Sequence, residues 1–247
     1  MRFACISILG LCRSQKTDLE RIAELRDAAI RLNSPLAYFQ PNDTKFSDPR
    51  KRRFFVDIER DLQSLDVDAW QFLKSEAVPL LTAKHPTRGW TQLFEKLNEA
   101  KGYRHLARIG CPNIAFIPRS KTISVRTPDL QGFLLIGKVL CEVKTINVSL
   151  IESNRRWSGG VGTKLAHLED GFFNKLTSDI NTAASQMAAH DADPGVRRIV
   201  YVVINFDDSL HEYAVEYQRQ IESYFASAST TGIEVVLDIK PPFYSAM

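Results

Sequence analysis

Two short stretches of the chain hold side chains suited to metal-assisted phosphodiester chemistry. Asp129 follows Thr127-Pro128, while Glu142 and Lys144 stand two residues apart in Cys141-Glu142-Val143-Lys144. Carboxylates are the hard anionic ligands that Mg²⁺ prefers. A Lys adds positive charge without competing for the metal, and it can stabilise charge that develops during a reaction. Together the three side chains could hold a divalent cation beside a reacting phosphate.

The residues between Asp129 and Glu142 predict a β-hairpin. Two apolar runs, 130–136 and 139–146, are joined at Gly137-Lys138. In such a hairpin Asp129 lies directly across from Glu142 or diagonal to it. Because cross-strand neighbours are about 5 to 8 Å apart, the two carboxylates could share one cation.

Strand alternation predicts which side chains share a face. Glu142 and Lys144 point to one face, and Val143 points to the other and can enter the core. A purely structural alternative is that Asp129 caps a turn while Glu142 and Lys144 form a surface ladder pair. The apolar residues 139–141 favour a strand that enters a core, where charged residues are rarely placed without use.

The elements around the hairpin predict an α/β fold with a mixed central sheet flanked by helices. Residues 1–85 form a helical N-terminal region that binds substrate or a partner, and residues 86–247 form the α/β domain. Apolar periodicity and capping signals predict helices over 18–30, 49–65, 69–81, 91–100, 171–190 and 210–226, and further strands over 113–117, 199–204 and 233–239. Gly102 is expected to end the helix that begins at Thr91.

The motif and the order of elements resemble the PD-(D/E)xK nuclease superfamily, whose fold is restriction-endonuclease-like. Pro128-Asp129 and Glu142-Val143-Lys144 match the two halves of its motif. The resemblance covers about residues 90–205. It implies a nuclease that uses Mg²⁺, with Mn²⁺ as a substitute, and that cuts DNA in preference to RNA through a metal-activated water.

The resemblance also implies further site residues. The family carries an acid on the helix before the first core strand; Glu95 and Glu99 are the candidates, and Glu95 is preferred because it lies nearer the middle of that helix. The family's helix after the motif strand often directs a Lys or Gln toward the site, and Lys175 and Gln186 match those positions. The implied catalytic set is Asp129, Glu142, Lys144, Glu95 and Gln186, with Asp129 and Glu142 as metal ligands.

A Gly-rich loop after the motif strand could contact nucleic acid. Arginines neutralise phosphates, and a Trp can stack on a base. The alternative is a solvated loop whose Trp packs on its own domain. The predicted nucleic-acid-binding residues are Arg155, Arg156, Trp157, Lys164 and Lys175.

Composition sets looser bounds. The 247 residues carry a net charge of +3, which is compatible with a polyanionic partner. The four cysteines form no CxxC pair, and no apolar run is long enough for a membrane span, so we expect a cytoplasmic protein with free thiols that makes no membrane contact. Two other functions stay open: a nuclease-fold protein that binds nucleic acid without cutting it, and an interaction protein that forms a homodimer or binds a partner through residues 1–85.

Overall fold

The computed structural model describes residues 18–43, 45–86, 88–120, 122, 126–147, 167–205, 213–227 and 232–240. Its centre is a mixed sheet with the strand order β1-β2-β3-β4-β5. The first three strands pair antiparallel, and β3, β4 and β5 pair parallel. The strands are β1 (Ala115–Phe116), β2 (Leu130–Leu134), β3 (Gly137–Ile146), β4 (Arg197–Asn205) and β5 (Glu234–Lys240). The predicted α/β class with a mixed sheet flanked by helices is confirmed.

The predicted hairpin is strands β2 and β3. Its turn lies at Leu135-Ile136, and Gly137, with φ of 138°, begins β3 in a conformation that favours glycine. The register pairs Leu130 with Cys141. One step further out, this register brings Asp129 opposite Glu142, as the sequence predicts.

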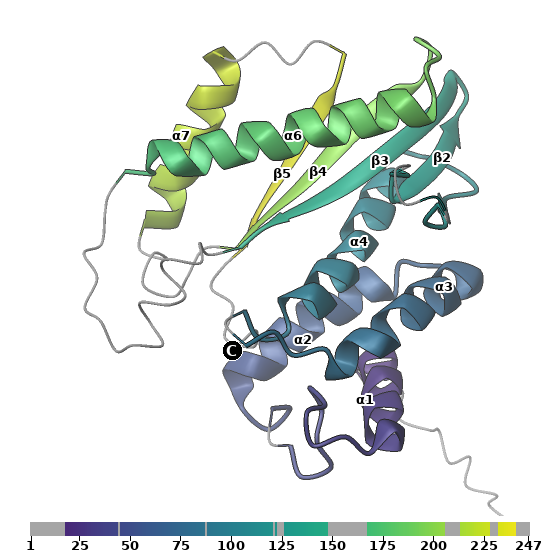
Figure 1. The fold of residues 1–247 in the computed structure, drawn as a ribbon, viewed down its shortest axis with the longest axis vertical. Coiled ribbons are helices and arrows are strands. Elements are labelled where there is room, and N and C mark those ends of the chain that lie inside the picture. The colour runs from purple at the N-terminus through teal and green to yellow at the C-terminus, as the bar shows by residue number, and fades with distance from the viewer. Residues whose placement is uncertain are drawn as a thin grey trace, which may run out of the picture.

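Helices cover both faces of this sheet (Figure 1). Val139 and Cys141 belong to the core on the α4 side, whereas Leu140 belongs to the core under α6 and α7. This alternation follows from the two-residue period of a strand. The helices are α4 (Thr91–Arg108) on one face, and α6 (Asp170–His190) and α7 (Ala214–Ser227) on the other.

The prediction that Gly102 ends its helix is wrong, because α4 continues to Arg108. Gly102 instead lies where the helix packs closely against the hairpin. A Cβ atom at this position would come within 2.6 Å of Val143 Cγ2 and 2.9 Å of Leu130 Cδ1. The glycine therefore permits close helix–sheet packing in the middle of α4.

In the part of the N-terminal region that the structure describes, the chain is helical, as predicted. Its elements are α1 (Glu20–Leu32), α2 (Pro49–Leu62), α3 (Val67–Ala77) and the 3₁₀ helix η1 (Val78–Thr82). Glu59 of α2 accepts hydrogen bonds from the backbone N–H groups of Arg21 (3.0 Å) and Ile22 (2.9 Å) at the start of α1. A residue from a neighbouring helix thus satisfies amides that a helix leaves unpaired at its N-terminus.

These helices share one hydrophobic core with α4 and the sheet. The Tyr38 ring lies 5.2 Å from Trp90 and 5.1 Å from Phe94, while Phe72 stacks on Phe116 of β1 at 5.4 Å. The predicted boundary at residue 85 lies between η1 and α4, and buried apolar packing continues across it. None of the described helices combines the length and the apolar character that a membrane crossing needs.

Candidate functional site

Backbone N–H groups hold the Asp129 and Glu142 carboxylates beside each other, where β2 begins next to the central strand β3. The Asp129 N–H donates to Glu142 Oε2 at 3.2 Å. The N–H of Val143 donates to Asp129 Oδ2 at 2.8 Å. Each carboxylate therefore contacts the strand that carries the other, and Glu142 is only 4% exposed.

Lys144 and Gln186 converge on the same buried carboxylate. Lys144 Nζ lies 2.6 Å from Glu142 Oε1. The Gln186 side-chain amide donates to Glu142 Oε2 at 3.0 Å and to the Thr127 carbonyl at 2.5 Å. The buried face of α6 fixes this geometry through Leu176, Ile180, Ala183 and Met187. Strand β3 and helix α6 thus supply two of the predicted site residues to Glu142.

Of the two α4 acids, Glu99 is the one whose charge interacts with that of Asp129. Its pKa is raised by burial and by the negative charge of Asp129. Lys96, three residues earlier and also buried, forms an ion pair with Glu99 at 2.6 Å. The preferred candidate, Glu95, instead accepts a hydrogen bond at 2.7 Å from the side chain of Asn147, which follows β3.

Burial and like charge make the carboxylates of this site basic. Burial, followed by the charge of Asp129, raises the pKa of Glu142 to about 7 and that of Glu99 to about 8. Burial also raises the pKa of Asp129. The nearby Lys144 and Lys96 act in the opposite direction without cancelling the effect. Negative charge in this site is therefore costly unless a cation offsets it.

The donor set suits a hard divalent cation. Among the described residues, no three His, Cys, Asp or Glu side chains are gathered as a metal-binding group. Mg²⁺, however, commonly takes only one or two carboxylates and completes its shell with water and phosphate oxygens. The adjacent carboxylates of Asp129 and Glu142 meet that requirement.

Other predicted residues lie elsewhere. Lys175 forms an exposed ion pair with Asp179 of its own helix at 2.7 Å, and its charge also acts on Glu95. Arg155, Arg156, Trp157 and Lys164 lie outside the described residues. Of the predicted free thiols, Cys111 and Cys141 are free and buried.

Two polar residues at the site were not predicted. Lys96 could have been found from its i, i+3 spacing to Glu99, because such residues are neighbours on a helix surface. Asn147 carries no comparable signal. The side-chain amide of Asn147 donates to Glu95, and its side-chain Oδ1 accepts a hydrogen bond from Asn205 of β4 at 2.9 Å. The second contact depends on the parallel pairing of β3 and β4.

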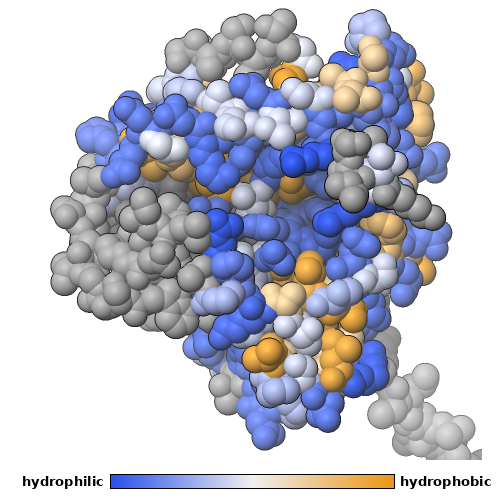
Figure 2. Space-filling model, viewed as in Figure 1, coloured by the Kyte–Doolittle hydropathy of each residue, from blue (hydrophilic) through white to orange (hydrophobic). Residues whose placement is uncertain are grey.

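Figure 2 shows hydrophilic residues gathered on the face that carries α6, around a recess below that helix. No family model, curated protein or solved structure matches the chain. The geometry and charge of the site are therefore the grounds for a functional proposal.

Proposed function

We propose that the protein is a metal-dependent nuclease that hydrolyses phosphodiester bonds, with DNA preferred over RNA, on a restriction-endonuclease-like version of its α/β fold. One observation carries the proposal. Glu142 is contacted at once by the Asp129 backbone, by Lys144 and by Gln186, each within 3.2 Å. The backbone of the second acid, a Lys and a Gln from the next helix thus all contact the Glu142 carboxylate.

The roles follow from the chemistry of each side chain. Asp129 and Glu142 would hold Mg²⁺ or Mn²⁺, and the ion would polarise the phosphate and lower the pKa of a water molecule. Lys144 is 23% exposed, so its amine can turn from Glu142 toward negative charge that develops in the reaction. Gln186 orients the Glu142 carboxylate, and Glu99 adds negative charge from α4.

Plasmid cleavage by single variants tests this proposal. We expect Asp129→Ala and Lys144→Ala to lower the rate at least about 100-fold in Mg²⁺ or Mn²⁺, the scale seen when one transition-state-stabilising group is removed. Lys138→Ala is the matched control. Lys138 lies on the same strand, has 25% side-chain exposure and pairs with Asp191 at the far end of the hairpin. An RNA substrate of equal length measures the preference for DNA.

Normal metal-dependent cutting by both site variants would sink the assignment. Circular dichroism and thermal unfolding of each variant show whether lost activity reflects lost folding.

A second function is supported by the low exposure of Glu142 and by the contacts that it already makes. The Glu142 side chain is only 5% exposed and is already bound by Lys144 and Gln186. A protein with this site could bind nucleic acid without cutting it, as a structural or regulatory subunit. In that case the wild-type protein would retard plasmid DNA in a gel and leave it intact with either metal.

A further inference from the structure

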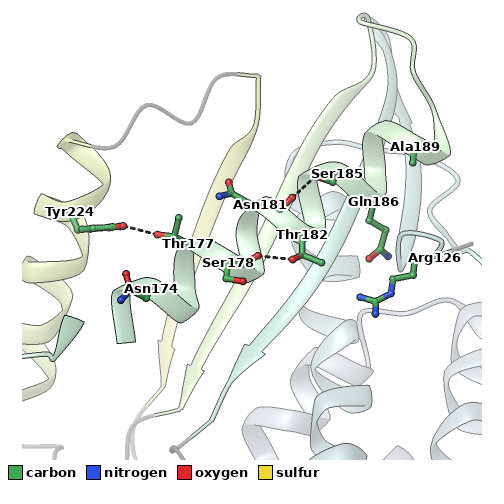
Figure 3. Close-up of a pocket in the computed structure, with 10 residues that line it drawn as sticks. All are labelled: Arg126, Asn174, Thr177, Ser178, Asn181, Thr182, Ser185, Gln186, Ala189 and Tyr224. Atoms are coloured by element: carbon green, nitrogen blue, oxygen red, sulfur yellow. Dashed lines mark hydrogen bonds between the residues drawn. The ribbon is translucent and has the colours of Figure 1, made fainter. Parts of the chain in front are cut away.

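A groove whose lining residues are mostly polar runs along helix α6 and ends at Gln186 of the candidate site. Its volume is about 910 Å³. Gln186 and Arg126 lie at one end and Tyr224 of α7 at the other (Figure 3). Gln186 also donates to Glu142 at 3.0 Å, so one lining residue connects the groove with the acid pair.

The groove is lined by hydrogen-bonding side chains with almost no charge. Three successive turns of α6 each supply two of them: Thr177 and Ser178, Asn181 and Thr182, Ser185 and Gln186. Such a pair recurs every four residues, which is about 6 Å along the helix axis. Arg126 is the one charged residue among those that line the groove in the described part of the chain. A solvated helix face more often carries Lys and Glu.

We infer that this groove binds a single strand of nucleic acid and guides it to Glu142. The inference rests on the proposed function for the identity of the ligand. Ser, Thr, Asn and Gln side chains are common partners of phosphate and sugar oxygens. The Thr182 and Ser185 hydroxyls donate to carbonyls of their own helix at 2.7 and 2.9 Å, bonds that such hydroxyls can exchange for a ligand oxygen.

The shape and charge of the groove favour one strand over a duplex. From Asn174 to Ala189 the lining extends over about 22 Å of helix, so the site is long and suits an extended chain. The Tyr224 ring stacks on Phe173 at 4.7 Å and its hydroxyl bonds to Thr177 at 2.6 Å, and an unpaired base can extend this aromatic stack. A duplex presents denser phosphate charge, which proteins bind mainly with Lys and Arg.

Fluorescence anisotropy with labelled 12-nucleotide oligothymidylate and oligouridylate, in EDTA to prevent cleavage, tests the inference. The variant Ser178→Ala/Thr182→Val/Ser185→Ala should weaken binding to a single strand at least tenfold and leave its salt dependence unchanged. A 12-base-pair duplex should change less than twofold. Arg126→Ala should reduce the salt slope by about 0.7, the value for one phosphate contact on a single strand.

Ser75→Ala is the matched control. Its exposed hydroxyl also donates to a carbonyl of its own helix, Phe72 O at 2.7 Å, but on α3. Wild-type affinity of the triple variant, equal losses for single strand and duplex, or no binding of either oligonucleotide by the wild type would overturn the inference.

The experiments can refute the groove proposal and the nuclease proposal independently of each other. Groove-dependent binding by a protein that cuts no nucleic acid would refute only the nuclease. Cleavage of single strands and plasmid by the triple variant at wild-type rates, with unchanged affinity, would refute only the groove.

Discussion

At the scale of single residues, the site is a set of acids whose ionisation is unfavourable. Glu142 and Glu99 are almost fully buried, and both lie within the influence of Asp129. Lys144 and Lys96 each pair with one of them at 2.6 Å. This balance of opposed charges has consequences for activity and for stability, and each can be measured.

The choice between the two α4 acids can be tested directly. We expect Glu99→Gln to lower metal-dependent cleavage about 10-fold or more, because the charge of Glu99 interacts with that of Asp129. Glu95→Gln keeps a hydrogen-bond acceptor for Asn147 and should cost several-fold less. The measurement is the initial rate of plasmid nicking at several Mg²⁺ concentrations. A larger loss from Glu95→Gln would restore the preference drawn from the sequence.

The raised pKa values predict how stability depends on pH. The folded-state pKa values of Glu142 and Glu99, about 7 and about 8, exceed the ordinary value of 4.5, so the folded protein binds protons more tightly than the unfolded chain. The stability that the two protonated acids contribute to the folded protein is fully present below about pH 4.5. It declines above that pH and is lost once the pH has risen through 7 to 8. We expect the free energy of unfolding of the metal-free protein, from urea titrations, to fall over this window.

The variant Glu99→Gln isolates this effect because an amide cannot lose a proton in this range. At pH 8.5 it should be more stable than the wild type by at least about 1.4 kcal/mol, the equivalent of one pKa unit. At pH 5 the two should differ little. Mg²⁺ should stabilise the wild type most at the alkaline end, since it binds the deprotonated acids. Parallel stability curves for the two proteins would contradict the assignment of the raised pKa.

At the scale of elements, the position of the acids depends on how closely α4 approaches the hairpin. Gly102 permits this approach because a Cβ there would overlap Val143 and Leu130. Val143 precedes Lys144 on β3, so displacement of α4 would be transmitted to the strand that carries two site residues. The close packing that a single glycine allows is therefore part of the construction of the site.

We expect Gly102→Ala to destabilise the protein by about 1–3 kcal/mol, the usual cost of overpacking a core, although Ala favours helices. Gly171→Ala on α6 is the matched control. No atom lies within 4 Å of the Cβ it would add, so it should be neutral or slightly stabilising. Urea unfolding of both variants gives the comparison. Equal effects at the two positions would show that the contact with Val143 is unimportant.

At the scale of the whole molecule, the N-terminal helices and the sheet are tied together by apolar and ionic contacts. Lys101 of α4 binds Asp61 of α2 at 3.1 Å and Asp238 of β5 at 2.6 Å. Arg104 also binds Asp61, at 2.7 Å. Because these groups join both parts of the chain, the helical region supports α4 in addition to any part it takes in binding substrate or a partner.

Removal of the N-terminal helices should therefore unfold the remainder. We expect a fragment of residues 86–247 to lack a cooperative thermal transition, because the face of α4 that contacts Tyr38 and Phe54 would be exposed to water. Differential scanning calorimetry of the fragment and the full chain checks this. A fragment that melts cooperatively near the temperature of the full chain would instead support residues 86–247 as an independent domain.

The sequence by itself determined the fold class, the hairpin and the pairing of the two acids. Periodicity and turn signals are local, so they predicted the hairpin, the α/β class and the placement of Asp129 opposite Glu142. Only the tertiary structure decided that α4 passes through Gly102, that the charges of Glu99 and Asp129 interact, and that Asn147 contacts Glu95. Those outcomes depend on the rotation and distance of helices against the sheet, which packing between distant parts of the chain sets and no local pattern encodes.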